Sequence, residues 1–178
     1  MLLNASDSSL LIIDVQEKLF EKIHNNILAS QVILDTIHVY STLELPIIYT
    51  EQYPKGLGPT IEIIKNKLKN LSILTKIEKT SFSCFYKTSK KLETKQVVIV
   101  GIETHICVLQ TAFDLLIAGH DVFILEDAVG SRKLRDKKMA LERAKQNGIE
   151  IVSLEMLVFE LLRDSKHKHF KKLSKIIK

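Results

Sequence analysis

Short apolar runs alternate along the chain with longer segments in which apolar residues recur every three or four positions. The short runs have the length and β-branched residues of buried strands, and the longer segments have the spacing of helices. Strands that alternate with helices predict a parallel sheet with right-handed crossovers. The chain is therefore predicted to form an α/β, single-domain, Rossmann-like three-layer fold with a six-stranded parallel sheet and helices on both faces. We expect strands at residues 10–13, 46–50, 72–75, 97–100, 121–125 and 149–152, and helices at 19–43, 61–71, 106–117, 136–146 and after 153.

The clearest strand–loop–helix unit runs from Val97 to Gly119. Four β-branched residues precede Gly101, as in a strand buried on both faces, and apolar residues at helical spacing begin at Ile106. This pattern places Cys107 in the first turn of the helix and beside the carboxyl end of the strand, where open α/β sheets bind their ligands. A thiol at a helix N-terminus tends to ionise, so Cys107 is a candidate nucleophile.

Two other interpretations of this segment remain open. Cys107 could be a small buried apolar residue, as most free cysteines are. The turn could instead bind a dinucleotide, with Glu126 and Asp127 near the position of a ribose-binding acid. That motif needs glycines where the backbone meets the pyrophosphate, and here Gly101 stands alone. We therefore expect no cofactor.

Composition and charge narrow the class of protein. Of the 178 residues, 46% are hydrophobic and 26% charged, as is ordinary for a globular protein of one domain. Residues 165–178 hold six lysines and no acid, which accounts for the whole net charge of +5 and makes nucleic acid an unexpected partner. No apolar run approaches the ~20 residues that span a bilayer. Two cysteines without CxxC spacing, and no basic signal-peptide start, predict a reducing, cytoplasmic location.

Two charged residues follow expected strands. Asp14 ends the apolar run 10–13, where an acid is costly unless it is paired, used or caps a helix. Lys79 follows the third strand, and the hydroxyl residues and phenylalanines after it resemble a half-buried pocket wall more than a solvated face. Because the carboxyl ends of parallel strands share one edge, Asp14, Lys79 and Cys107 can converge as base, electrostatic support and nucleophile. His105 is not the expected base, since it lies two residues from Cys107 and so on another helix face.

These residues lie in three motifs that together resemble the isochorismatase-like cysteine hydrolases. The motifs are LIIDVQ (11–16), KTSFSCF (79–85) and VGIETHICV (100–108). The resemblance covers residues 10 to about 163 and looks closest to the branch called isochorismatase domain-containing proteins, to which TEQYPKGLG (50–58) also belongs. We expect a hydrolase domain at 1–164 and a basic tail at 165–178 that forms a solvated or subunit-docking helix.

The resemblance implies a catalytic triad of Asp14, Lys79 and Cys107, with the backbone N–H groups of Glu103 and Cys107 as the oxyanion hole. It also suggests a cis peptide bond between Ile102 and Glu103, which would turn the Glu103 N–H into the pocket. The implied reaction is hydrolysis of an amide or related C–N bond of a small-molecule substrate through a thioester. The residues expected to line the substrate pocket are Gln16, Phe20, Glu51, Phe82 and Thr104.

At two points the sequence departs from the family pattern, and each departure argues against a particular substrate or reaction of the family. Nicotinamidases of this family hold a metal with Asp-x-His after the second strand, whereas this chain has Glu51-Gln52-Tyr53, so we expect neither a metal nor nicotinamide. True isochorismatases cleave a vinyl ether and need no cysteine nucleophile, so Cys107 argues against that reaction. An alternative function is a non-catalytic protein that binds a small ligand or serves as an oligomeric interaction protein. The family's habit of assembling implies a homo-oligomer.

Overall fold

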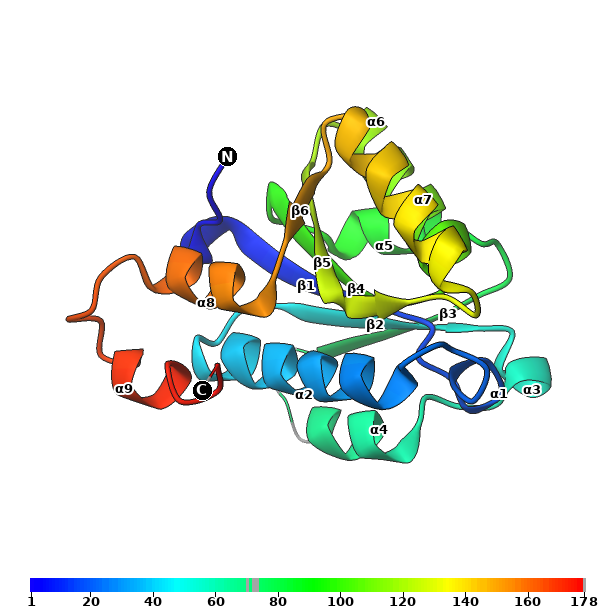
Figure 1. The fold of residues 1–178 in the computed structure, drawn as a ribbon, viewed down its shortest axis with the longest axis horizontal. Coiled ribbons are helices and arrows are strands. Elements are labelled where there is room, and N and C mark those ends of the chain that lie inside the picture. Colours follow the sequence, from blue (N-terminus) through cyan, green and yellow to red (C-terminus); the bar gives the residue numbers. More distant parts are fainter. Residues whose placement is uncertain (70, 72–73, 178) are drawn as a thin grey trace.

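A six-stranded parallel sheet forms the centre of the molecule, in a computed structural model that describes residues 1–69, 71 and 74–177 (Figure 1). The prediction of six parallel strands in one α/β domain is confirmed. The third strand is described from Leu74 onward, and residues 72 and 73 of the expected range lie outside the described residues. The strands lie in the order β3-β2-β1-β4-β5-β6, and they are β1 (Ser8–Ile13), β2 (Ile47–Gln52), β3 (Leu74–Lys79), β4 (Gln96–Ile102), β5 (Asp121–Gly130) and β6 (Glu150–Val152).

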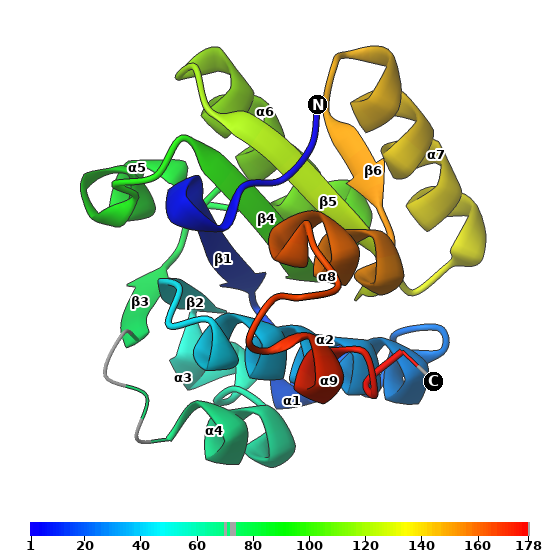
Figure 2. The ribbon, with the colours of Figure 1, turned by 90° about the vertical axis from the view of Figure 1, so that its left-hand side faces the viewer.

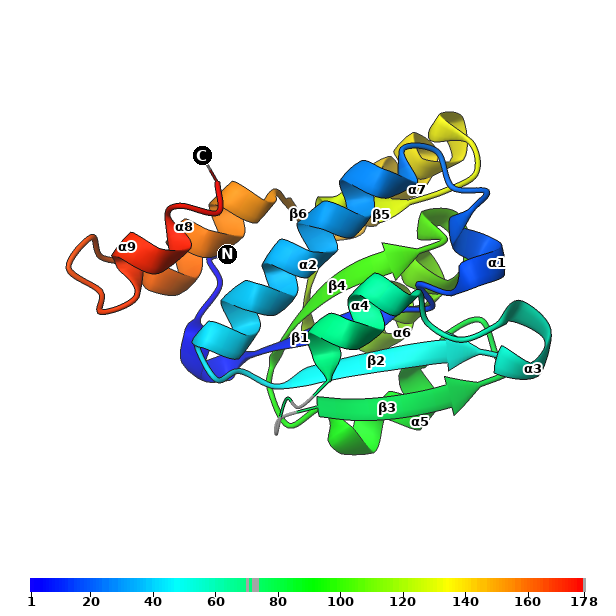
Figure 3. The ribbon, with the colours of Figure 1, turned by 90° about the horizontal axis from the view of Figure 1, so that it is seen from below.

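Helices cover both faces of the sheet (Figures 2 and 3). Helices α2, α4 and α8 pack on one face, and α5, α6 and α7 pack on the other, so that two apolar clusters enclose the sheet. The helices are α1 (Glu17–Phe20), α2 (Asn26–Thr42), α3 (Pro54–Leu57), α4 (Glu62–Leu68), α5 (Phe85–Thr88), α6 (Leu109–Ile117), α7 (Leu134–Gln146), α8 (Leu154–Leu162) and α9 (Phe170–Leu173). Shorter turns are η1 (Ala5–Asp7), η2 (Ser89–Lys91) and the π-helical turn η3 (Thr104–Val108).

The alternation of side chains along β1 explains why its whole length is apolar. Leu10 and Ile12 point into the cluster under α2, whereas Leu11 and Ile13 point into the cluster under α6 and α7. All four are at most 1% exposed. Each buried aliphatic side chain contributes roughly 1.5–3 kcal/mol to folding, so the central strands anchor everything attached to their ends.

The expected helix at 19–43 is wrong as a single element. It is two helices, α1 and α2, separated by a turn in which Asn25 adopts a left-handed conformation with φ 56°. The side chain of Asn26 donates a 3.0 Å hydrogen bond to the carbonyl of Phe20 and fixes this turn. Asparagine tolerates the left-handed region better than most residues, so the break has a local cause that the apolar spacing does not reveal.

The lysine-rich tail, for which the sequence predicts a solvated or subunit-docking helix, is only partly helical. It contains one helical turn, α9, which folds back onto the cluster formed by α2 and α8 (Figure 1). Leu173 is completely buried there, and the rings of Phe170 and Phe159 lie 6.3 Å apart. The apolar side of the tail is therefore used within the chain.

The strand order reverses direction between β1 and β4, which makes this point of the sheet's carboxyl edge the expected ligand site. Gly101 pairs with Ile13 across the two strands. It has φ 118°, and a side chain there would collide with the Ile13 carbonyl oxygen. Glycine is therefore required for β4 to approach β1 where the site forms.

Candidate active site

Asp14 is the first residue beyond β1 and is completely buried. Its backbone takes a left-handed conformation, φ 50°, and its N–H donates to the Thr50 carbonyl at 3.2 Å. The carboxylate has two protein partners. Oδ2 lies 2.6 Å from Nζ of Lys79, and Oδ1 accepts a 2.7 Å hydrogen bond from the Thr50 hydroxyl. The acid at this strand end is therefore paired and held in one orientation.

Lys79 is the last residue of β3, and its side chain, like that of Asp14, has no exposed surface. Besides Asp14, its ammonium contacts Oε1 of Gln52 at 2.7 Å and the carbonyl oxygens of Phe82 and Ser81 at 3.0 and 3.2 Å. An ammonium has three N–H donors, and four protein oxygens surround this one. Lys79 thus holds a fixed positive charge against Asp14.

Cys107 lies in η3, the π-helical turn that leads into α6, and is 5% exposed. Burial raises the pKa of its thiol to about 12; the negative charge of Asp14 acts in the same direction, and Lys79 partly opposes both. The expectation that a helix N-terminus would favour ionisation is therefore wrong for this thiol. The structure brings Asp14, Lys79 and Cys107 together, and the raised pKa of the thiol favours its protonated form at neutral pH.

The loop between β4 and η3 contains a cis peptide bond between Ile102 and Glu103, as the sequence predicts. The Glu103 carboxylate is largely buried, and its Oε2 accepts hydrogen bonds from Nε and from the backbone N–H of Arg132 at 3.0 and 3.2 Å. Thr104 is 1% exposed, and its hydroxyl has no hydrogen-bond partner among the described residues. This loop is thus fixed by its side chains while one buried hydroxyl beside it stays unpaired.

His105 has a polar partner outside the Asp14–Lys79 pair. Its Nδ1 lies 2.9 Å from the Ser131 hydroxyl, on the loop after β5. This contact agrees with the interpretation that His105 is not the base.

Two of the expected pocket residues, Gln16 and Glu51, form hydrogen bonds with other protein groups. Gln16 is completely buried, and its Nε2 donates to the carbonyls of Gln52 and Gly58 at 3.0 and 2.7 Å. Glu51 lies within β2 and points to the face opposite Thr50. Its Oε1 accepts from the backbone and hydroxyl of Thr60, both at 2.8 Å. The expectation that Glu51 faces the same pocket as Cys107 is therefore wrong, because neighbouring residues of a strand point to opposite faces.

The charge of Glu51 is also already neutralised. Burial alone would raise the pKa of its carboxyl group, but hydrogen bonds from Lys76 and Thr60 outweigh burial and lower that pKa. Oε2 of Glu51 lies 2.9 Å from Nζ of Lys76. Two further expected pocket residues are aromatic: Phe20 is half-buried against the α2 face, and the ring of Phe82 is 56% exposed.

Thr50 and Gln52 are the contacts that the sequence reasoning missed. They lie two residues apart and therefore on one face of β2, where they reach Asp14 and Lys79. The signal was present as two polar residues at the end of a buried strand. It was overlooked because the expected strand ended at residue 50, which left Gln52 in a loop.

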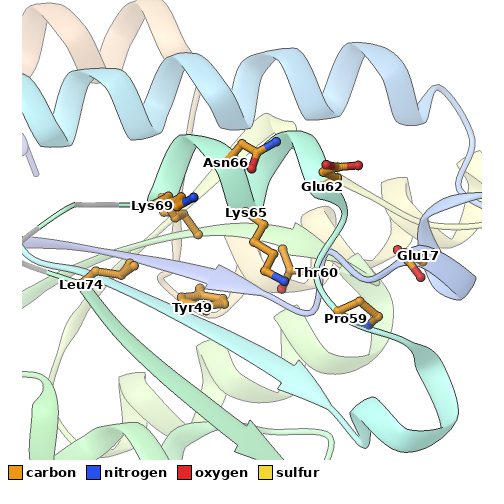
Figure 4. A pocket seen from close by; sticks show the side chains of 10 residues that line it. Glu17, Tyr49, Pro59, Thr60, Glu62, Lys65, Asn66, Lys69 and Leu74 are labelled. Carbon is orange, nitrogen blue, oxygen red and sulfur yellow. The ribbon is translucent and has the colours of Figure 1, made fainter.

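A hollow beside α4 is not part of this arrangement. A cavity of about 550 Å³ lies between α4 and strands β2 and β3, with Tyr49, Thr60 and Lys65 among its walls (Figure 4). Tyr49 belongs to the cluster under α2, on the face opposite Cys107. A smaller hollow of about 330 Å³ includes Lys79 and Tyr53 at the outer edge of β3.

Within residues 1–69, 71 and 74–177, no group of three or more His, Cys, Asp or Glu side chains is arranged to hold a metal ion. No described helix combines the length and the apolar character needed to span a bilayer.

The fold and the site define a doubly wound α/β protein with a buried Cys–Asp–Lys set at the switch point of its sheet. Residues 8–156 match the family model for the isochorismatase domain. The chain belongs to this family of hydrolases.

Individual relatives agree with this assignment. The chain is 38% identical to isochorismatase domain-containing protein 2 of Xenopus laevis over 98% of this chain and 85% of that protein. A Caenorhabditis elegans structure named MAR1 ribonuclease superimposes with a TM-score of 0.94 at 36% identity, covering 99% of this chain and 92% of that one. The Escherichia coli YcaC protein, described as an octameric hydrolase of unknown specificity, shares the fold with a TM-score of 0.90 at 23% identity, covering 99% and 89% of the two chains.

Proposed function

We propose that the protein is a cysteine hydrolase that cleaves an amide or related C–N bond of a small molecule through a thioester on Cys107. The observation that carries the proposal is the completely buried Asp14–Lys79 ion pair beside a buried thiol. A buried ion pair adds little stability compared with apolar residues of the same volume. Its position at the ligand-binding edge of the sheet therefore favours a chemical role.

In the first step, Asp14 accepts the thiol proton as the sulfur of Cys107 attacks the carbonyl carbon. A C–S bond forms, and the carbonyl electron pair moves onto the oxygen. The backbone N–H groups of Glu103 and Cys107 donate to this oxyanion, which is the part of such a reaction where fixed donors have the largest effect. Because the thiol is protonated beforehand, transfer to Asp14 accompanies attack.

In the second step, the C–N bond breaks, and Asp14 returns its proton to the departing nitrogen. A water molecule then gives a proton to Asp14 and attacks the thioester. The C–S bond then breaks with its electron pair going to the sulfur, the acid product leaves, and Asp14 returns the proton to the sulfur of Cys107. Lys79 stays charged throughout and acts by holding Asp14, since its N–H groups are already engaged by protein oxygens.

Thr104 and Phe82 are the proposed substrate contacts with the clearest support. The unpaired hydroxyl of Thr104 lies three residues before Cys107 in the same π-helical turn, and a bound substrate could supply its missing partner. The exposed ring of Phe82 can cover an apolar part of the substrate. Phe20 remains a proposed contact, and Gln16 shapes the pocket by holding the loop that contains Gly58.

RNA is the competing substrate class, because the similar C. elegans protein bears the name ribonuclease. The residues favour a carbonyl substrate. A buried thiol paired with a carboxylate suits acyl transfer, in which the sulfur forms a covalent thioester. A non-catalytic ligand-binding or interaction protein is the other alternative, and it would form no acyl-enzyme.

We further propose that the protein works without a metal, as a homo-oligomer and in the cytoplasm. Glu51, the acid nearest the family's metal motif, already binds Thr60 and Lys76. Both cysteines are free and buried, which suits a reducing compartment. Large apolar side chains such as Ile27 and Ile117 are exposed, and the similar E. coli protein is described as octameric.

The test is a screen of small amides, ureas and carbamates for release of ammonia or amine, with a structured RNA as a separate arm. Wild type, Cys107→Ala and Cys84→Ala are compared. The proposal expects turnover of at least one C–N substrate by wild type and Cys84→Ala, and none by Cys107→Ala. Cleavage of RNA alone, equally fast with Cys107→Ala, would reject it.

A further inference from the structure

Strand β3 forms one margin of the sheet (Figures 2 and 3). It pairs with β2 on one side, and among the described residues no strand lies on its other side. Part of its backbone N–H and C=O groups therefore point out of the sheet, where another strand can bind them. The opposite margin, β6, has three residues against the six of β3. Strand β3 is thus the longer open edge of the sheet.

The exposed side chains of β3 carry opposite charges in a symmetric order. Lys76 and Glu78 lie two residues apart and so on one face, whereas Ile77 between them packs on the other face, on the α5 side. The side chains of Lys76 and Glu78 are 42% and 58% exposed. A lysine alone keeps foreign strands away from an edge. A lysine and a glutamate placed evenly about Ile77 have the reverse effect on a second, antiparallel copy of the strand.

One antiparallel register between two β3 strands pairs these charges. With Ile77 opposite the same residue of a second copy, Lys76 lies opposite Glu78 of that copy, and Glu78 lies opposite its Lys76. A pair centred on Lys76 or on Glu78 would place like charges opposite each other. A pair centred halfway between two of these residues would set a charge opposite Ile77, which belongs to the other face. The charges of β3 therefore select a single register.

We propose that the β3 strands of two copies of this chain pair antiparallel about Ile77 and join the two six-stranded sheets into one. The inference rests on the proposed homo-oligomer and names the contact that forms it. Backbone hydrogen bonds between the strands provide the affinity, as in other cases of strand addition to a sheet edge. The two Lys76–Glu78 pairs fix the register. This contact is separate from the exposed apolar side chains at the start of α2.

The ammonium of Lys76 is suited to this contact. It lies 2.9 Å from Oε2 of Glu51 and 3.0 Å from Oε1 of Glu78 in its own chain. An ammonium has three N–H donors, so one is left for Glu78 of the second copy. The other lysine of the strand, Lys79, does not oppose the pairing, because its side chain is buried against Asp14 and has no exposed surface.

The first test is disulfide cross-linking of Ile77→Cys. In the proposed register the two introduced cysteines are directly opposite, with Cβ atoms about 4.5–5.5 Å apart, close to the geometry of a disulfide. The matched control is Thr75→Cys, two residues earlier on the same face, where the two cysteines would lie about 14 Å apart along the strands. Wild type is the blank, since Cys84 and Cys107 are buried.

Each protein is oxidised at micromolar concentration with copper phenanthroline, and the products are separated by non-reducing electrophoresis. Most of Ile77→Cys should become a disulfide-linked dimer, whereas Thr75→Cys and wild type should stay largely as single chains. Peptide mass spectrometry should find the bond between two copies of residue 77.

A charge reversal tests the same register without a new thiol. Glu78→Lys places lysines opposite each other at two positions, so it should raise the dissociation constant of the contact by about tenfold or more. The control Glu142→Lys makes the same charge change at an exposed position of α7 and should leave that constant within about twofold. Light scattering over a dilution series measures both. This variant decides the question if Ile77→Cys folds poorly.

The outcomes separate this contact from the functions on which it rests. Equal cross-linking of Ile77→Cys and Thr75→Cys would overturn the proposed pairing, as would unchanged association of Glu78→Lys. An oligomeric wild type whose Ile77→Cys variant folds but does not cross-link would reject this interface and leave the homo-oligomer standing, whereas a monomeric wild type would reject both. None of these measurements needs turnover, so the proposed hydrolysis stands or falls independently.

Discussion

The ammonium nitrogen of Lys79 lies 2.6 Å from Oδ2 of Asp14, and neither side chain has any exposed surface. The two residues are 65 positions apart in the sequence and meet because β1 and β3 both end at the carboxyl edge of the sheet. Removing one partner leaves a buried charge without compensation. The pair therefore links the stability of the fold to the chemistry of the site.

Replacement of Lys79 by methionine should lower the free energy of unfolding by about 3–5 kcal/mol, the usual cost of breaking a buried ion pair from one side. The matched control is Lys22→Met, at an exposed position, which should change it by no more than about 0.5 kcal/mol. Urea unfolding followed by circular dichroism measures both. Similar small changes in the free energy of unfolding of the two variants would contradict the claim that Lys79 and Asp14 form a buried ion pair.

Asp14→Asn should abolish hydrolysis and yet make Cys107 alkylate faster at neutral pH. The negative charge of Asp14 raises the pKa of the thiol, so its removal lowers that pKa and increases the thiolate fraction below pH 8. Peptide mass spectrometry after timed treatment with iodoacetamide measures the rate at Cys107. Glu51→Gln removes a carboxylate on the other face of β2 and should leave the rate unchanged. Slower alkylation of Cys107 in Asp14→Asn would contradict the claim that the charge of Asp14 raises the pKa of this thiol.

Chelation should not reduce the activity. Glu51 is held by Thr60 and Lys76, and no histidine follows it in the loop to complete a metal site. After dialysis against EDTA, turnover of a substrate found in the screen should stay within about twofold of the untreated rate. Loss of activity that zinc or manganese restores would refute metal independence.

The protein should be at least a dimer at micromolar concentration. Ile27 and Leu28 are neighbours in α2 and are 76% and 67% exposed, and adjoining exposed apolar side chains favour an interface. Leu173 of the tail does not contribute to this surface, since it is buried within the chain. Multi-angle light scattering gives the mass directly, and a monomer across the whole concentration range would contradict the prediction.

The sequence predicted the strands well because buried parallel strands are continuous apolar runs, as in Val97 to Val100. It predicted that Asp14, Lys79 and Cys107 lie close together because parallel strands end at one edge. It failed where a single local contact decides the outcome. The turn at Asn25 breaks a helix that the apolar spacing would continue, and Glu51 faces away from the site because β2 extends to Gln52.

The predicted ionisation of the Cys107 thiol failed for a different reason. The helix N-terminus suggested easy ionisation of Cys107, but the field of a helix end is a modest effect. Burial and the nearby carboxylate of Asp14 outweigh it and raise the thiol pKa. Neither burial nor the distance to Asp14 can be read from the order of residues.

The central claim is that Cys107 forms a thioester with the acyl part of its substrate. The most direct measurement is intact and peptide mass spectrometry of protein mixed with a turned-over amide and quenched in acid within the first turnovers. The account predicts an added acyl mass on the peptide that contains Cys107, in wild type and Cys84→Ala alike, which hydroxylamine removes. Hydrolysis by Cys107→Ala at the wild-type rate, with no acyl mass on Cys107 in the wild type, would contradict it.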